Sequence, residues 1–117
     1  MDKSIVASVL RLVGLGVRSR GAVVGVEQVR EAAKKGKLVL ALVASDASEN
    51  SVVKVVPLLE ARRVRIERIP SAIELGQAVG REQTAAVGIV DVQLAKGITQ
   101  LLDTASDGSL GEGVRIE

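Results

Sequence analysis

The chain has 117 residues, of which 47 % are hydrophobic, and its 16 basic side chains exceed its 14 acidic ones by two. This length and apolar fraction are typical of one globular domain and exclude a disordered chain. The chain has no His, Cys or aromatic residue, which excludes Ser-His and Cys-His nucleophiles, thiolate chemistry and zinc sites with nitrogen or sulfur ligands.

The N-terminal third of the chain predicts two helices. Asp2 or Ser4 caps the first, whose apolar residues recur at helical spacing. Glycines are expected to loosen the end of this helix and to form a turn after it, at positions 14, 16 and 21. A second helix is predicted over 25–35, with Gly36 as its C-terminal stop.

The rest of the chain alternates strands and helices. The uninterrupted apolar run 38–44 is typical of a central strand covered on both faces, whereas 64–69 alternates apolar and charged residues as a half-exposed strand near an edge does. Pro57 is expected to kink or divide a helix over 49–63. The remaining predicted elements are a short helix over 72–79, a buried strand over 84–90 and a last helix from Asp91 to about Asp103.

This alternation predicts an α/β fold in which helices cover both faces of a sheet. Residues 1–105 are expected to form one domain, and the Gly- and Ser-containing stretch 106–117 a flexible C-terminal tail. The N-terminus does not begin a signal peptide, and no apolar stretch is long enough to cross a bilayer. We therefore expect a soluble, cytoplasmic protein that does not contact membranes.

Charge is distributed unevenly along the chain. Residues 1–37 carry 8 basic and 3 acidic groups, whereas residues 69–117 carry 3 basic and 7 acidic ones. Such a separation indicates a polyanionic partner, and a solvated surface whose charges segregate by chance explains it equally well.

Tests for catalytic and cofactor motifs give negative results. The pair Gly14 and Gly16 lacks both the third glycine and the preceding strand of a dinucleotide fingerprint, and Gly36-Lys37 is followed by Leu38 rather than Ser or Thr. Glu27 and Glu31 have basic residues three or four positions on, so helix-surface ion pairs explain them better than acid-base catalysis does. We expect no enzyme activity, no cofactor, no metal and no small-molecule substrate.

The start of the second predicted helix is more informative. Gly25-Val26-Glu27-Gln28 follows a basic turn that contains Arg18 and Arg20. A helix N-terminus offers unpaired amides and a partial positive charge, which suit a phosphate, and the side chains of Glu27 and Gln28 can read base edges. An ordinary amphipathic surface helix is the equally weighted alternative. Without aromatic rings the chain cannot stack splayed bases, so recognition must use shape, phosphates and polar groups.

Four stretches in collinear order resemble the ribosomal protein L7Ae family of kink-turn RNA-binding proteins, specifically its small bacterial members. The resemblance covers roughly residues 9–103 and is carried by residues 12–20 with 24–25, 36–50, 73–82, and 87–91 with 95–96. It implies a three-layer α-β-α sandwich with a central four-stranded mixed sheet, and a structured RNA as partner. In relatives the N-terminal turn of the second helix reads tandem sheared G·A pairs of a sharply bent duplex. The resemblance therefore implies a kink-turn RNA as partner, with ribosomal RNA as one source.

The family pattern can be carried over residue by residue. Strong binders begin this helix with Gly-x-Asn-Glu-x-x-Lys, which corresponds here to Gly25, Glu27, Gln28 and Glu31. Glu31 reverses a charge that faces RNA in relatives, and the resemblance leaves Arg20, Arg30 and Lys34 as the cations that could compensate.

A second RNA contact is implied at the loop that begins with Gly80. There Arg81 would meet phosphates of a bulged nucleotide, while Val79 and the pair Ile69-Pro70 would supply an apolar wall. The RNA-binding residues that we predict are Arg18, Arg20, Gly25, Val26, Glu27, Gln28, Arg30, Lys34, Val79 and Arg81. A protein-interaction module on the same fold, with weak or lost RNA affinity, is the alternative that Glu31 and the acidic C-terminal region favour.

Overall fold

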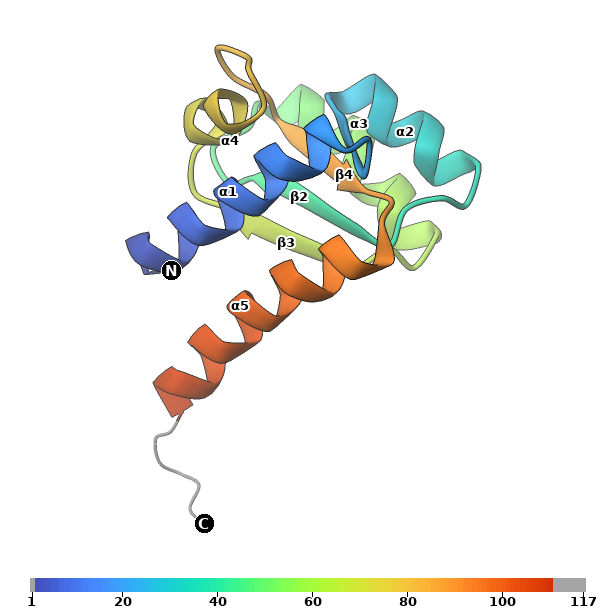
Figure 1. The fold of residues 1–117 in the computed structure, drawn as a ribbon. Helices are drawn as coiled ribbons and strands as arrows, with labels where there is room; N and C mark the ends of the chain where they lie inside the picture. The colour runs from blue at the N-terminus through green and yellow to red at the C-terminus, as the bar shows by residue number, and fades with distance from the viewer. Residues whose placement is uncertain (1, 111–117) are drawn as a thin grey trace.

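The computed structural model describes residues 2–110, and the side chains of residues 2–104. Helices and strands alternate throughout this part of the chain (Figure 1). The elements are α1 (Lys3–Arg18), β1 (Ala22–Val24), α2 (Val26–Lys34), β2 (Leu40–Ala44), α3 (Glu49–Ala61), β3 (Ile66–Ile69), α4 (Ala72–Ala78), β4 (Ala86–Ile89) and α5 (Val92–Leu110).

The four strands form one mixed sheet in the order β1-β4-β2-β3. β2 pairs with β3 in parallel and with β4 in antiparallel orientation, and β1 pairs with β4 in antiparallel orientation. Every residue of β2 is buried, and β3 forms one edge of the sheet. The predicted central and edge strands are therefore confirmed.

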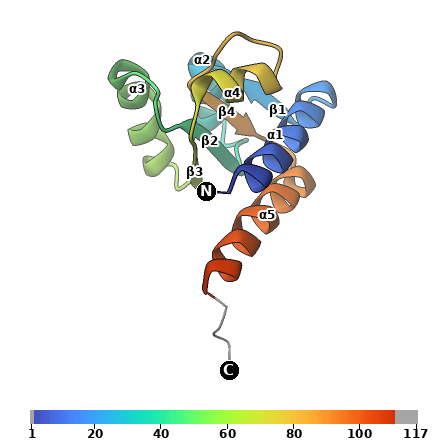
Figure 2. The same cartoon turned by 90° about the vertical axis from the view of Figure 1, so that its left-hand side faces the viewer.

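Helices pack on both faces of the sheet, which confirms the predicted three-layer sandwich. Leu40 and Leu42 point into a core with α1, α4 and α5, whereas Ala41 and Val43 point into a second core with α2 and α3. Figure 2 shows α3 on one side of the sheet and α1 and α5 on the other. The period-two alternation of the buried strand divides its side chains between the two cores.

Side-chain caps begin four of the helices. Asp2 accepts a hydrogen bond from the Ser4 amide, and Asp91 accepts from the amides of Gln93 and Leu94, as the sequence predicts. The serines at positions 48 and 71 cap α3 and α4 in the same way. Gly36, with φ +69°, ends the turn after α2, which confirms it as the predicted stop.

The glycines of α1 have a role different from the predicted one. Gly14 and Gly16 lie inside the helix and are buried. A Cβ at Gly14 would lie 2.8 Å from the Ala78 carbonyl oxygen, and one at Gly16 would overlap the side chain of Leu94. The prediction that they loosen the helix end is wrong because they allow α4 and α5 to approach α1 closely.

Strand β1 was not predicted from periodicity. Its three residues are half-buried and follow the turn at Gly21, whose carbonyl accepts hydrogen bonds from the amides of Val90 and Asp91. A three-residue strand is too short to display a repeat, so only its pairing with β4 defines it.

Two helices differ from the prediction: α3 ends at Ala61 rather than at residue 63, and α5 is longer than expected. α3 continues through Pro57 without being divided. α5 extends to Leu110, so the predicted end near Asp103 is wrong, and residues 106–110 of the predicted tail are helical. A glycine such as Gly108 lowers helix propensity by about 1 kcal/mol but does not by itself end a helix. Residues 111–117, the rest of that predicted tail, lie outside the described residues.

None of the helices within residues 2–110 combines the length and the apolar character needed to cross a bilayer.

Candidate nucleic-acid interface

The N-terminus of α2 is open to solvent and lacks a side-chain cap. Gly25 occupies the N-cap position with φ +97° and ψ 157°, and among the described residues no side chain hydrogen-bonds to this end. The first amides of a helix have no partner within it, so those of Val26, Glu27 and Gln28 remain available to a ligand. A Cβ added at Gly25 would meet nothing within 4 Å. The glycine is therefore needed for its backbone conformation, and the space above it is free.

The loop between α4 and β4 presents a second exposed segment. Arg81, Glu82 and Gln83 are exposed, and Gly80 takes φ +81°. The base of the loop is anchored, because the Arg81 amide donates to the Gly76 carbonyl at 2.8 Å and the Thr84 amide to the Ala72 carbonyl at 3.0 Å. The Arg81 side chain thus extends from a tethered turn.

Strand pairing brings these two segments together. β1 runs antiparallel to β4, with Val24 opposite Val87, and the Gly25 amide donates to the Ala86 carbonyl at 2.9 Å. The N-terminus of α2 and the end of the 79–85 loop therefore lie side by side at one end of the sheet. The sequence separates them by more than half of the domain, so only the fold creates this surface.

Six of the predicted residues lie at or beside this surface. The side chains of Glu27, Gln28 and Arg81 are exposed, and Gly25, Val26 and Val79 are half-buried. Val79 packs against the core below α4. It can thus offer only part of its side chain to a ligand.

Arg30 is engaged elsewhere. Its guanidinium donates to the Lys54 carbonyl of α3 and thereby ties the second turn of α2 to that helix. The prediction of Arg30 as an RNA contact has to accommodate this second role.

Three other predicted residues do not join the surface. Arg20 precedes Gly21, which pairs with the far end of β4. Lys34 is the last residue of α2, about 13 Å along the helix from its first turn. Ile69, expected in an apolar wall, is fully buried in the core.

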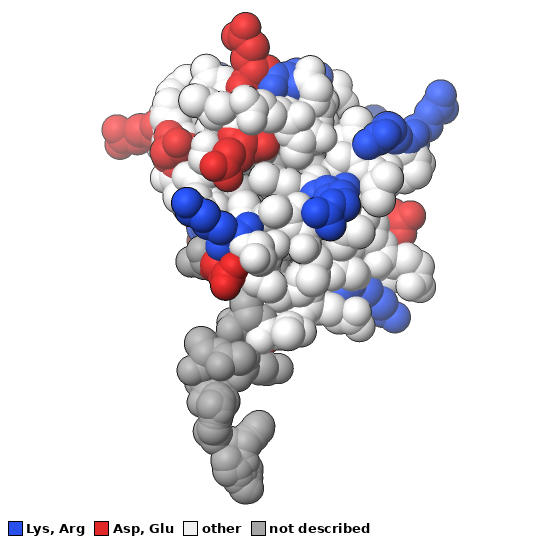
Figure 3. Space-filling model, turned by 60° about the vertical axis from the view of Figure 1, so that its left-hand side comes forward, with Lys and Arg blue, Asp and Glu red and all other residues white. Residues whose placement is uncertain are grey.

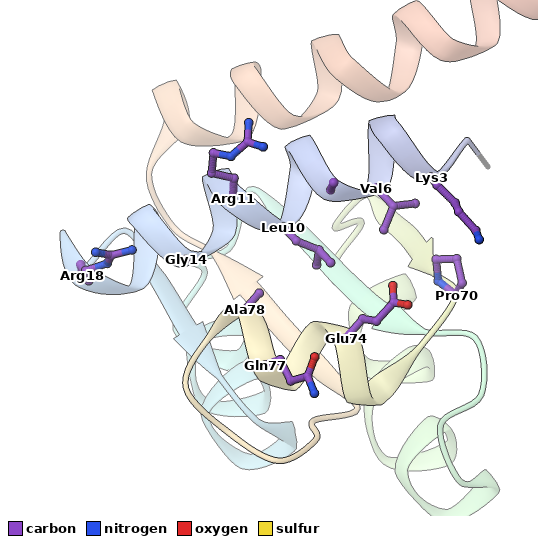
Figure 4. Close-up of a pocket in the computed structure, with 11 residues that line it drawn as sticks. Lys3, Val6, Leu10, Arg11, Gly14, Arg18, Pro70, Glu74, Gln77 and Ala78 are labelled. Carbon is purple, nitrogen blue, oxygen red and sulfur yellow. The ribbon is translucent and has the colours of Figure 1, made fainter.

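Arg18 lies at one end of a groove between α1 and α4 (Figure 4). The groove has a volume of about 790 Å³. Its floor is partly apolar, with Val6, Leu10 and Ala78, and Pro70 lies at its other end. Arg18 and Pro70, both predicted to contact RNA, therefore line this groove and do not belong to the surface at the N-terminus of α2.

The carboxylates of α2 lack the predicted ion pairs. Within residues 2–104 the ion pairs are those of Arg65 with Glu67 and Asp103, so Glu27 and Glu31 are not paired with Arg30 or Lys35. The predicted pair of Glu27 with Arg30 is absent because the Arg30 guanidinium donates to α3 instead; nothing in the structure explains the absence of the Glu31–Lys35 pair. Figure 3 looks onto the face that carries α1 and α4, where acidic side chains gather at the upper left and basic ones lie at the centre and right.

Two residues that support this surface were missed from the sequence. Gly76 lets the loop cross α4, since a Cβ there would overlap the backbone of Gln83. Thr84 is buried and its hydroxyl donates to the Ala86 carbonyl at 3.2 Å. Gly76 lies within the family-like stretch 73–82, but the sequence assigns no role to it or to Thr84, because both contacts depend on the packing of α4. No cluster of acidic side chains suited to a metal ion occurs in the described part of the chain.

Comparison with known proteins gives a consistent picture. The model of the ribosomal protein L7Ae/L30e/S12e/Gadd45 family matches residues 7–99. The curated "RNA-binding protein YlxQ" of Bacillus subtilis (strain 168) is 30 % identical over 92 residues, which cover 79 % of this chain and 92 % of that protein.

Two solved structures share the fold. A protein of unknown function from Bacillus halodurans C superposes with a TM-score of 0.73 and 26 % identity, covering 81 % of this chain and 96 % of that one. The Giardia lamblia 15.5kD RNA binding protein superposes with a TM-score of 0.74 and 20 % identity over 91 % of each chain.

Proposed function

We propose that this chain, which belongs to the ribosomal protein L7Ae/L30e/S12e/Gadd45 family, binds RNA and recognises the kink-turn, a sharply bent duplex with tandem sheared G·A pairs. The comparisons support a non-enzymatic RNA-binding protein, and the chain has neither His nor Cys to act as an activated nucleophile or general base. The printed name of that relative supports RNA as the ligand.

One observation carries the proposal: the uncapped N-terminus of α2 lies beside the anchored loop that presents Arg81. The amides of α2 can donate to base edges or phosphates, and Gln28 can both donate and accept. Arg81 can hold a phosphate on the other side. Two contact segments fixed relative to each other favour an RNA whose two arms are bent toward each other.

A direct test compares a kink-turn RNA with a straight duplex of equal length and composition by electrophoretic mobility. We expect the Kd for the kink-turn to be at least about a hundredfold lower, as specific sites usually are relative to non-specific ones. Exchange of the sheared G·A pairs for Watson-Crick pairs should remove the difference. Equal Kd values for both RNAs would refute kink-turn recognition.

Ribosomal RNA is the source that we propose first for such a motif. The test is co-sedimentation of the protein with ribosomal subunits at low and high salt. Recovery only in the RNA-free fractions at both salt concentrations would contradict a ribosomal source.

Protein binding is a second candidate function, and the groove between α1 and α4 favours it. Three cations, Lys3, Arg11 and Arg18, and one carboxylate, Glu74, line the groove beside an apolar floor. This excess of positive charge suits an acidic amphipathic helix. Capture of one stoichiometric partner from nuclease-treated lysate, lost with Arg11→Glu and retained with Lys96→Glu, would support it. Capture that both variants retain would exclude the groove as the binding site.

A further inference from the structure

Five exposed cations gather where α2 and α3 end. Lys34, Lys35 and Lys37 come from the end of α2 and the segment after it, and Arg62 and Arg63 from the end of α3. The Arg62 guanidinium donates to the Lys34 carbonyl at 3.0 Å and to the Ala33 carbonyl at 3.5 Å. These hydrogen bonds hold the two segments side by side. We call these five residues the C-terminal basic cluster, after the C-terminal ends of the helices α2 and α3.

The topology places this cluster at the end of the sheet opposite to the loop that presents Arg81. β2 and β3 are parallel, so the segments that precede these two strands lie at the same end of the sheet. The Ala41 amide donates to the Arg65 carbonyl there, at 2.9 Å. Figure 1 shows the C-terminal ends of α2 and α3 close together at the right of the molecule. The cluster is thus built where two helices lead into parallel strands, α2 into β2 and α3 into β3.

The charge of the cluster is largely uncompensated. The last turn of each helix carries one carboxylate, Glu31 in α2 and Glu60 in α3, so the five cations exceed the nearby acidic groups by three. None of the five forms an ion pair within residues 2–104.

The neighbouring Arg65 shows the contrast. Its guanidinium hydrogen-bonds to Asp103 at 2.9 Å and to Glu67 at 2.7 Å, and these bonds raise the pKa of Arg65. Carboxylates neutralise Arg65 within the protein, whereas none of the five cluster cations has a carboxylate partner within residues 2–104, and Arg62 donates to backbone carbonyls.

The chemistry of the cluster fits phosphates better than a protein surface. Protein interfaces depend on buried aromatic and aliphatic anchors, whereas the large apolar side chain exposed here is Val39, at 40 %. Duplex backbones are held by Lys and Arg on a polar surface. A single-stranded ligand would need rings for stacking, and this chain has none.

We propose that the C-terminal basic cluster binds the phosphate backbone of double-stranded RNA and forms a second RNA contact, about 13 Å along α2 from the first. The inference rests on the proposed function in that it takes RNA as the ligand. The phosphates belong either to an extended arm of the RNA held at the N-terminus of α2 or to a separate duplex.

The test uses the variant Lys35→Gln/Lys37→Gln/Arg63→Gln of the full chain. Arg62 is left intact because it holds α2 and α3 together. A matched control, Lys54→Gln/Arg68→Gln/Lys96→Gln, removes three exposed cations that belong neither to the cluster nor to the groove between α1 and α4. The ligands are a kink-turn RNA with short arms, the same RNA with either arm extended, and a straight duplex. Each Kd is measured as a function of salt concentration.

We expect the slope of the logarithm of the association constant (1/Kd) against the logarithm of the salt concentration to become shallower by about two to three for the cluster variant. Each lost phosphate contact removes about 0.9 from this slope. The control should keep the wild-type slope. If an arm of the same RNA supplies the phosphates, the cluster variant shows the shallower slope only with an RNA that has an extended arm, and the complex is one-to-one. If a separate duplex supplies them, the loss appears when straight duplex is added to protein saturated with the short-armed RNA.

Equal slopes for the cluster variant and the control with every RNA would overturn the proposal. A protein that does not prefer the kink-turn would instead overturn the proposed function. The straight duplex still reports on the cluster in that case, so the two failures are distinguishable.

Discussion

Arg20 and Arg63 both adopt the left-handed backbone conformation, with φ of +64° and +58°. L-residues pay about 1 kcal/mol or more for this conformation, and glycine does not. Arg63 follows α3, where its amide donates to the Glu60 carbonyl and the Val64 amide to the Leu59 carbonyl. This is the bond pattern of a helix end that usually contains glycine.

We therefore expect Arg63→Gly to raise the free energy of unfolding by about 1 kcal/mol. Urea denaturation followed by far-ultraviolet circular dichroism measures this change. The matched control is Lys54→Gly in the middle of α3, which should lower the free energy of unfolding by about 1 kcal/mol. A decrease with Arg63→Gly would contradict strain at this position.

Glu31 is the residue in α2 that we expect to oppose RNA binding most directly. It is exposed, lies between the N-terminus of α2 and the C-terminal basic cluster, and is not paired within residues 2–104. We expect Glu31→Lys to lower the Kd for kink-turn RNA about fivefold and to steepen the salt dependence by about one.

The neutral variant Glu31→Gln should give about half of that change in binding free energy. Gln100→Lys on α5 is the control: like Glu31→Gln it raises the net charge by one unit, and we expect it to leave the Kd unchanged. An unchanged or higher Kd with Glu31→Lys would show that RNA does not lie along this part of α2.

Among the elements, α4 and its following loop depend on one close contact. The loop backbone at Gln83 passes over Gly76 with no room for a Cβ. Thr84 completes the anchor through its backbone hydrogen bond to Ala72. The position of Arg81 therefore depends on a buried glycine five residues before it.

Gly76→Ala should lower the free energy of unfolding by about 1–3 kcal/mol, because the added methyl overpacks the site. It should also weaken kink-turn binding through displacement of the loop. Gly97→Ala in α5 is the control: its Cβ would meet Leu12 at 3.5 Å, an ordinary contact, so the free energy of unfolding should be unchanged or about 1 kcal/mol higher. Urea denaturation of both variants checks the comparison, and equal stability would contradict it.

At the scale of the whole molecule, the sheet separates two surfaces. α2 and α3 both run from the end of the sheet that carries the 79–85 loop to the end that carries the C-terminal basic cluster. α2 therefore presents its amides at one end and lysines at the other. A rigid core on both faces of the sheet keeps this spacing constant.

Because the two surfaces lie about 13 Å apart along α2, and no ion pair joins them within residues 2–104, substitutions in them should act independently. We expect the effects of Arg81→Gln and of Lys35→Gln/Lys37→Gln on binding of a long-armed kink-turn RNA to add within about 0.5 kcal/mol. A double-mutant cycle of Kd values measures the coupling. A coupling energy above about 1 kcal/mol would show that the two ends communicate.

The sequence by itself determined the layers, the central and edge strands and most helix starts, because apolar periodicity and capping residues act over a few neighbouring positions. It also indicated the family and the residues at Gly25 and Arg81 that the fold brings to one surface. Only the tertiary structure decided that β1 exists, that Gly14 and Gly16 serve packing, and that Arg30 turns to α3. It also placed Arg20 and Lys34 away from the surface at Gly25. These features depend on contacts between residues distant in sequence, and local patterns carry no signal for such contacts.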